Sequence, residues 1–261
     1  MSEGRGGAGA GRKLGFLAAG PSSGRPLAVT HGWAADSSFT SCISALFPNR
    51  RVLLIDMPGY GRSAGLADAA PDFDRTLELL ADTLPEGCDL MCWSLSSLFG
   101  FALCARGLLE GRLVTVCGSP RLPDEPGNPG LKERYVRRLL EALTPSSAPH
   151  LVALFYAAQR HGLGGERIAQ CFKSFKLPPY GVLKAGIDIM AAADERGDFM
   201  RMKTPALHLF GKRDLLVPPA QSEIMARRPG STCAVLAHSA HMPFITEPLA
   251  FAKAVSSFLT Y

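Results

Sequence analysis

Ser94 is the residue whose surroundings point most directly to chemistry. It lies in Leu90-Met91-Cys92-Trp93-Ser94-Leu95-Ser96-Ser97, where a short apolar run ends among small residues and a helix-like stretch, Ser97 to Arg106, follows. This order predicts a nucleophile elbow, a sharp strand-to-helix turn that exposes the serine hydroxyl. The flanking positions usually hold glycine, whereas this chain has Cys92 and Ser96. A turn or helix N-cap serine is the alternative interpretation.

A serine nucleophile needs a base and, in most cases, an acid that orients the base. His241 follows an apolar strand and precedes the last helix pattern, with His238 as its rival in the same loop. Asp214 directly follows the apolar run Ala206 to Phe210, and a turn aspartate is the alternative for it. The chain order serine, aspartate, histidine, each after its own strand, favours a catalytic triad.

Two backbone N–H groups are needed to bind an oxyanion. Leu95, next to Ser94, supplies the first. The loop Thr30-His31-Gly32-Trp33, after another apolar run, is expected to supply the second through Trp33. We interpret His31 as a structural histidine, and the glycine after it as a point where backbone approaches the substrate.

The composition fits one α/β domain of 261 residues. A serine nucleophile with its base is expected to need no metal or organic cofactor. The charge balance of 28 Lys+Arg against 23 Asp+Glu is too even to indicate nucleic acid, and no apolar run approaches the length of a membrane span. Seven scattered cysteines lack CxxC or zinc-ligand spacing, which favours buried thiols in a reducing compartment. We expect a cytoplasmic monomer with a flexible leader, residues 1–12.

Alternating strand and helix patterns predict a mainly parallel sheet covered on both faces. The expected strands are Leu14 to Ala18, Leu27 to Thr30, Arg51 to Ile55, Cys88 to Cys92, Leu113 to Cys117, Ala206 to Phe210 and Thr232 to Leu236. The first two are joined by a turn at residues 20–24. The helices expected between or after the strands are Thr76 to Thr83, Leu98 to Arg106, Gln221 to Ala226 and Leu249 to Phe258.

Residues 121–198 interrupt the alternation after the Leu113 to Cys117 strand. A Pro- and Gly-rich loop is followed by helical patterns and no convincing strand: Leu131 to Leu143, Leu151 to Arg160, Arg167 to Phe175 and Val182 to Ala193. Ligands of open α/β sheets bind at the carboxyl ends of the strands, so we expect this insertion to be a lid over the site. Residues 13–120 and 199–261 form the predicted core.

Together these residues resemble the α/β-hydrolase superfamily, and more closely the pimeloyl-[acyl-carrier protein] methyl ester esterases of biotin synthesis. The shared motifs are His31-Gly32-Trp33, Asp56-Met57-Pro58-Gly59-Tyr60-Gly61-Arg62-Ser63, Trp93-Ser94-Leu95, residues 182–189 around Gly186-Ile187-Asp188, and His241-Met242-Pro243-Phe244-Ile245. The first two are general to the superfamily, and the others are more specific to the esterases. The resemblance extends over nearly the whole chain.

The resemblance implies an α/β-hydrolase fold and a serine carboxylesterase that converts the methyl ester of pimeloyl-acyl-carrier protein to the free acid and methanol. It assigns Ser94 as nucleophile, Asp214 as acid and His241, rather than His238, as base. The substrate contacts that it implies, together with the aromatic groove expected from the ring positions, are Trp33, Trp93, Leu95, Phe155, Tyr156, Ala157, Ala158, Gln159 and His241. The two elbow substitutions are expected to affect rate more than mechanism.

An acidic carrier protein would need a basic docking surface, and basic residues gather in the predicted lid. Arg134, Arg137 and Arg138 share one helix face with Lys132 nearby, and Arg160 follows. A solvated helix face is the alternative. Two other functions remain open: a general short-chain acyl carboxylesterase, and an inactive homologue that only binds an acyl carrier. A dehalogenase would need aspartate in place of Ser94.

Overall fold

A seven-stranded sheet forms the centre of the computed structural model, which describes residues 13–158 and 165–260. The strand order is β1-β3-β2-β4-β5-β6-β7, with every neighbouring pair parallel except β1 and β3. The strands are β1 (Phe16–Ala19), β2 (Leu27–Thr30), β3 (Val52–Ile55), β4 (Asp89–Trp93), β5 (Leu113–Val116), β6 (Ala206–Gly211) and β7 (Ser231–Leu236). The predicted α/β class and the mainly parallel sheet are confirmed.

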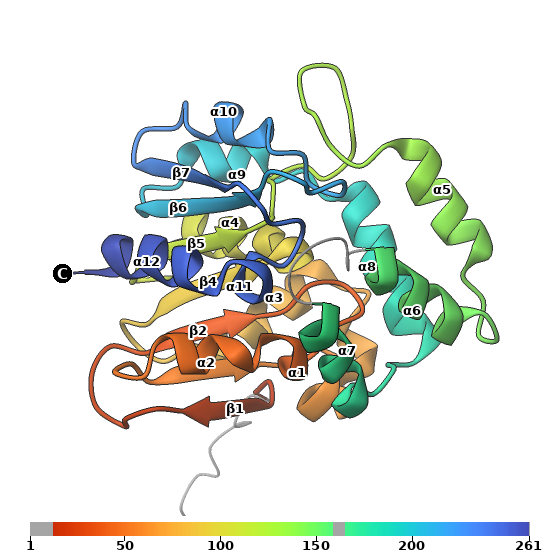
Figure 1. Ribbon diagram of the computed structural model, residues 1–261, viewed down its shortest axis with the longest axis horizontal. Helices are drawn as coiled ribbons and strands as arrows, with labels where there is room; N and C mark the ends of the chain where they lie inside the picture. The colour runs from red at the N-terminus through yellow and green to blue at the C-terminus, as the bar shows by residue number, and fades with distance from the viewer. Residues whose placement is uncertain (1–12, 159–164, 261) are drawn as a thin grey trace, which may run out of the picture.

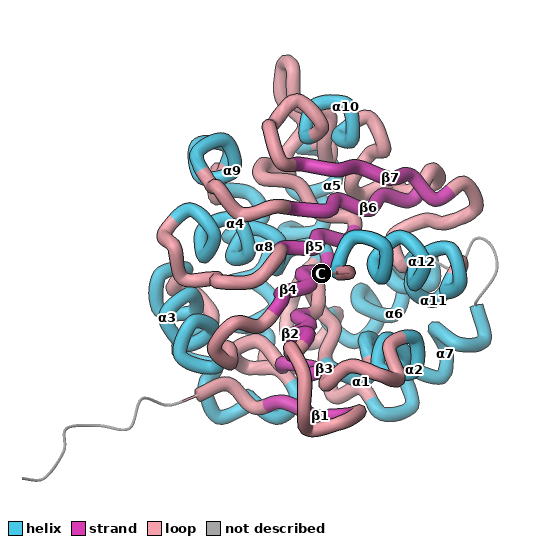
Figure 2. The backbone as a smooth tube through the Cα atoms, turned by 90° about the vertical axis from the view of Figure 1, so that its left-hand side faces the viewer, coloured by secondary structure: helices cyan, strands magenta, loops and turns pink. Residues whose placement is uncertain are grey.

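Helices cover both faces of this sheet (Figure 2). On one face lie α3 (Phe73–Thr83), α4 (Ser97–Ala105) and α9 (Arg196–Arg201); on the other lie α1 (Ser37–Thr40), α2 (Cys42–Leu46), α11 (Pro243–Thr246) and α12 (Pro248–Leu259). Helix α10 (Gln221–Met225) packs beside β6 and β7. Two 3₁₀ segments, η1 (Gly61–Ala69) and η2 (Ser94–Ser96), complete this part of the chain.

The strands are apolar on both sides because both sides are covered. Leu27 and Val29 belong to one hydrophobic cluster, whereas Ala28, between them, belongs to the other. Successive side chains of a strand point to opposite faces, so a run without alternation fits a sheet buried on both faces. The short central strands β2, β3, β4 and β5 are buried along their whole length.

The first strand, β1, does not pair with β2, the strand that follows it in the chain. β1 and β2 are joined by a turn, but β1 pairs antiparallel with β3, with Phe16 opposite Ile55 and Ala19 opposite Val52. β2 lies on the other side of β3, in parallel register. The local turn signal therefore identifies two strands but does not determine their partners.

Of the five helices that the described residues form between β5 and β6, the first four occupy the right-hand side of the molecule in Figure 1, beside the carboxyl ends of the strands. They are α5 (Glu133–Ala142), α6 (Ala148–Ala158), α7 (Gly165–Ser174) and α8 (Tyr180–Ala192). The next helix, α9, packs against α4 and so lies with the sheet-covering helices. Residues 1–12, the predicted leader, lie outside the described residues.

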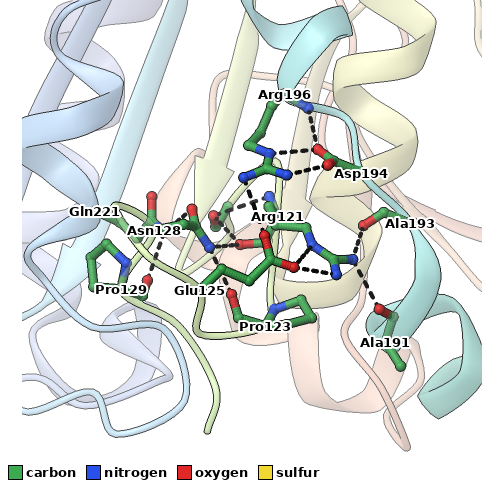
Figure 3. A network of polar contacts seen from close by, with 11 residues as sticks. Arg121, Pro123, Glu125, Asn128, Pro129, Ala191, Ala193, Asp194, Arg196 and Gln221 are labelled. Carbon is green, nitrogen blue, oxygen red and sulfur yellow. Dashed lines mark hydrogen bonds and ion pairs between the residues drawn. The ribbon is translucent and has the colours of Figure 1, made fainter. Parts of the chain in front are cut away.

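A network of polar contacts ties the two ends of this helical segment together (Figure 3). The Arg121 Nη1 donates to the carbonyl oxygens of Ala191 and Ala193, each at 2.9 Å. These carbonyls end helix α8, where a cation is favourable. The buried Gln221 of α10 donates from Nε2 to the Asn128 Oδ1 at 2.8 Å. The ends of the segment are thereby fixed to each other and to the core.

All seven cysteines are free thiols. Burial raises the pKa of Cys92, beside the predicted nucleophile, to about 12. Such a thiol stays protonated, which fits a Cys92 side chain that packs in the core and does not react. Within residues 13–158 and 165–260, no helix has the length and apolar character that crossing a membrane would require.

Candidate active site

Ser94 stands at the turn between β4 and the helical run η2 and α4. Its φ of +59° is in the left-handed region, which few non-glycine residues adopt outside sites where the surroundings hold them. A Cβ added to Gly32 would lie 3.0 Å from the Ser94 Cβ, so the loop after β2 passes directly beside the serine. This is the geometry of a nucleophile elbow, and the turn or N-cap alternative does not account for it.

The two non-glycine flanking residues are accommodated by their surroundings. A Cβ on Gly100 of α4 would lie 2.9 Å from the Cys92 Sγ, so the space that the thiol needs comes from a glycine on the helix side. The Ser96 hydroxyl accepts a hydrogen bond from the Thr30 Oγ1 at 2.8 Å and donates to the Trp93 carbonyl oxygen at 3.0 Å. Strand and helix can converge here without glycine at either flank.

The three residues predicted from separate strand ends meet at one point. The His241 Nε2 lies 2.8 Å from the Ser94 Oγ, and its Nδ1 lies 2.7 Å from the Asp214 Oδ2. The Asp214 Oδ1 accepts from the backbone N–H groups of Leu216 and Val217, which fixes the carboxylate. All three side chains are buried or nearly so, with Ser94 the most accessible at 9%. The arrangement can remove the serine proton and stabilise the resulting imidazolium.

The structure separates the histidines that the sequence left as alternatives. His238 is exposed, and its backbone N–H donates to Glu247, whereas His241 contacts the serine. The indole Nε1 of Trp93 donates to the His241 carbonyl oxygen at 2.9 Å and holds that loop. His31 is buried, and its Nε2 accepts from the Met57 N–H at 2.9 Å. Burial lowers the His31 pKa, consistent with a neutral structural histidine.

The backbone N–H groups of Leu95 and Trp33, predicted to bind an oxyanion, belong to segments that meet at Ser94. That of Leu95 lies at the start of the helical run, where no intrahelical acceptor exists. That of Trp33 follows Gly32 in the loop that approaches Ser94, and no hydrogen bond within residues 13–158 and 165–260 uses it. Both are available to a carbonyl oxygen that becomes negative.

A small, predominantly apolar cavity lies beside the serine. We call it the inner cavity; its lining is Gly32, Trp33, Trp93, Ser94, Leu122, Leu131, Leu139, Phe155, Tyr156, Met190, Leu216, Val217 and His241. Beside α5 it adjoins a larger, more open hollow, the outer groove, with about 1180 Å³ of empty space. The two share Leu131, Leu139, Phe155 and Leu216 in their linings.

A sequence profile of the alpha/beta hydrolase family matches residues 27–254. The chain belongs to the α/β-hydrolase family. Pimeloyl-[acyl-carrier protein] methyl ester esterases from Serratia marcescens and Pectobacterium carotovorum subsp. carotovorum are 31% and 32% identical to it over 245 and 241 residues. These alignments cover 90% and 89% of this chain and 94% and 93% of the relatives. The resemblance inferred from the motifs is confirmed.

Solved structures agree with the fold. A hydrolase from Oleispira antarctica superimposes with a TM-score of 0.78 at 15% identity, covering 95% of this chain and 94% of its own. An esterase from Exiguobacterium antarcticum has a TM-score of 0.75 at 19% identity, covering 94% of both chains. At these identities the likeness concerns the α/β-hydrolase fold alone.

The remaining predicted site residues of this hydrolase fall into three groups. Trp33, Trp93, Phe155 and Tyr156 line the inner cavity, whereas the Leu95 side chain faces a separate cavity with His31 and Ile189. Ala157 and Ala158 are the last residues of α6. Gln159 and Arg160 lie outside the described residues.

The predicted docking arginines lie on α5 and are exposed. Arg134 stacks over the Tyr135 ring, 4.9 Å from its centroid, and lines the outer groove. Arg137 lies 3.9 Å from Glu141, and both side chains are about two-thirds exposed. Val136, on the opposite face of the helix, is buried. The three arginines Arg134, Arg137 and Arg138 therefore present charge to solvent while α5 packs with its other face.

Sequence reasoning missed several residues of the site. Leu216 and Val217 line the cavity and hold Asp214, and their position directly after the acid is a signal that could have identified them. Leu122 lies in the Pro-rich loop, whose composition carries no such signal. Cys117 has a φ of +48° and its thiol belongs to a group with Asp214 and His241 whose ligand atoms lie within 4.8 Å of one another.

That thiol, carboxylate and imidazole set is the one group among the described residues that could hold a metal ion at such spacing. Its carboxylate and imidazole are already paired with each other at 2.7 Å, and the imidazole also contacts Ser94. The geometry is therefore that of a nucleophile and its base, with Cys117 packed beneath them.

Proposed function

We propose that this chain is a serine carboxylesterase that hydrolyses the methyl ester of pimeloyl-acyl-carrier protein, yielding pimeloyl-acyl-carrier protein and methanol in biotin synthesis. The observation that carries the reaction class is the continuous hydrogen-bonded series from Ser94 through His241 to Asp214. The substrate class rests on the relatives, whose names state that activity. Their alignments cover about nine-tenths of this chain.

In the proposed mechanism the Ser94 Oγ attacks the ester carbonyl while the His241 Nε2 takes its proton. Asp214 accepts from the Nδ1–H and so holds the tautomer that leaves Nε2 free as a base. The amides of Leu95 and Trp33 stabilise the tetrahedral oxyanion, each by about 3 to 4 kcal/mol if they resemble donors removed in other enzymes. His241 then protonates the departing methanol, and water hydrolyses the acyl-enzyme by the same route.

The form of the cavity supports a long acyl chain attached to a larger carrier. The inner cavity is lined by aromatic and aliphatic side chains, suited to the methylene groups of a pimeloyl chain. The outer groove shares four lining residues with the inner cavity and is also lined by Lys132 and Arg134. A carrier's phosphate-bearing arm would meet these cations at the rim. We propose residues 121–198 as the lid, with Arg134, Arg137 and Arg138 as the docking face.

Hydrolysis of the carrier-bound methyl ester by the wild-type protein and by Ser94→Ala tests this function. We expect methanol release from the wild type and a loss of at least 10⁴-fold in the variant, because the nucleophile is removed. A short nitrophenyl ester serves as the second substrate. If the wild type cleaves that ester and leaves the carrier-bound one intact, the chain is a general esterase. If a fluorophosphonate leaves Ser94 unlabelled, an inactive carrier-binding homologue remains.

A further inference from the structure

The peptide that follows Trp33 is held by two tyrosine hydroxyls. The Tyr156 hydroxyl donates to the Trp33 carbonyl oxygen at 2.8 Å, and the Ala34 N–H donates to the Tyr60 hydroxyl at 3.3 Å. Ala34 has a φ of +53°, a left-handed conformation that costs an alanine energy. External contacts must therefore keep this loop in its shape beside Ser94.

Tyr156 belongs to α6, far from Trp33 in the chain, and its side chain is fixed by the rings packed around it. It is 1% exposed, and its ring packs against Phe39, Phe155 and Phe172 with centroids 4.7 to 5.3 Å apart. Burial raises the pKa of its phenol well above the usual value, so the hydroxyl keeps its proton. Its contact with the Trp33 carbonyl is thus a hydrogen bond with a fixed donor.

The Trp33 side chain is tied to a second helix of the same segment. Its indole Nε1 donates to the Leu183 carbonyl oxygen of α8 at 2.8 Å. A Cβ on Gly186 would lie 2.5 Å from the Trp33 Cδ1, so the ring rests directly on the helix backbone. Both the carbonyl and the indole of Trp33 are therefore bound by helices between β5 and β6, whereas no hydrogen bond among the described residues uses its N–H.

We propose that Tyr156 is a positioning residue that couples helix α6 to the oxyanion hole, its hydroxyl setting the Trp33 peptide so that the Trp33 N–H binds the developing oxyanion. This inference rests on the serine mechanism of the proposed function and is independent of which acyl group is cleaved. A displacement of α6 would move the oxyanion donor, so a ligand that displaces α6 should change the rate as well as the affinity. By linkage, an occupant of the oxyanion hole stabilises that position of α6.

Tyr156→Phe tests the coupling because it removes the hydroxyl and keeps the ring. We expect kcat for nitrophenyl butyrate and the rate at which a fluorophosphonate labels Ser94 to fall about tenfold each, part of the loss known for a deleted oxyanion donor. KM should change less than twofold. A trifluoromethyl ketone, which forms a tetrahedral oxyanion on Ser94, should bind about tenfold more weakly.

Two variants separate positioning from stability. Tyr180→Phe removes a hydroxyl from α8 for which no hydrogen bond is found among the described residues, and it should label at the wild-type rate. Thr83→Val removes a buried hydroxyl that accepts from the Leu14 N–H far from the site. It should lower the unfolding midpoint without slowing labelling. Wild-type labelling in Tyr156→Phe, or an equal loss in Thr83→Val, would overturn the coupling.

The comparison of labelling rates also does not depend on the proposed substrate. If the wild type is labelled and cleaves nitrophenyl butyrate but not the carrier-bound ester, the substrate assignment fails, while the ratio of labelling rates still decides the role of Tyr156. If the wild type is not labelled at all, Ser94 is not a nucleophile and both proposals are overturned.

Discussion

The strand ends that carry Ser94, Asp214 and His241 and the helices α5 to α8 face each other across the inner cavity, yet they are built differently. Each of the three residues follows a parallel strand, and the hydrogen bonds that join them are buried. The four helices present exposed charge on α5 and connect to the core through the Arg121 network and through Trp33. The strand ends thus bring the three side chains together inside the core, whereas the helical segment packs its buried residues onto that core and turns charged residues to solvent.

This difference has a consequence for substitutions. A change at the strand ends should affect all ester substrates alike, since in the proposed mechanism every substrate uses the same nucleophile and base. A change on the outer face of the helices should affect only substrates that touch that face. Trp33 belongs to both regions, because it lines the inner cavity with Ser94 and its carbonyl and indole are bound by α6 and α8.

The largest effect is expected at the strand ends. Asp214→Asn should keep the acceptor for the Leu216 and Val217 N–H groups but present an amide N–H to His241, which favours the wrong tautomer. We expect kcat to fall about 10⁴-fold for any ester, as in the serine protease example of this change. Steady-state kinetics on two esters measures it. Asp188→Asn, at an exposed ion pair on α8, is the control and should be silent. A loss below tenfold in Asp214→Asn would contradict its role.

A second change tests the connection between the regions. Gly186→Ala places a Cβ 2.5 Å from the Trp33 Cδ1, so the indole and the oxyanion donor attached to it must shift. We expect kcat for a small ester to fall about 10- to 100-fold, the upper value approaching the loss of a donor. Gly181→Ala, on the same helix but with no atom within 4 Å of the added Cβ, should leave kcat unchanged. Equal rates in the two variants would show that Trp33 tolerates the shift.

The smallest effect is expected on the exposed face of α5. Replacing Arg134, Arg137 and Arg138 by Ala should lower kcat/KM for the carrier-bound ester about tenfold at low salt, and less as salt screens the attraction. Turnover of nitrophenyl butyrate should change less than twofold. The matched control removes the same amount of positive charge from three exposed residues outside residues 121–198, namely Lys203, Arg227 and Lys253. Similar losses on both substrates would exclude a docking role for these arginines.

The sequence predicts all seven strands to within two residues at their ends, because each is a short apolar run bounded by turn residues. Four helical patterns between residues 121 and 198 likewise match α5 to α8. The short helices α1, α2, α9 and α11 are absent from that prediction, since four to six residues carry little periodicity, whereas the five-residue α10 matches the expected Gln221 to Ala226. The partner of β1 is also missed, because pairing depends on where β3 lies and not on the turn.

For the site, the pattern around Ser94 and the order of the three residues locate the nucleophile and acid, and the family motif chooses His241 over His238. That choice stays open from the residues alone, because both histidines lie in one loop after one strand. The structure separates them by contact with Ser94 and by burial. Cavity residues such as Leu122 could not be predicted, because their loop carries turn composition and its path depends on the polar network at Arg121.

The sequence by itself determined the fold class, the chain order of the three residues and the family. Strand ends and short motifs are local features, so they can be recognised from the order of the amino acids alone. Only the tertiary structure decided how Cys92 fits, through the missing side chain of Gly100, and that Tyr156 binds Trp33. The Tyr156 contact joins residues 123 positions apart. Nothing local distinguishes a tyrosine that lines a cavity from one whose hydroxyl holds a distant peptide, since that depends on how the helices pack over the sheet.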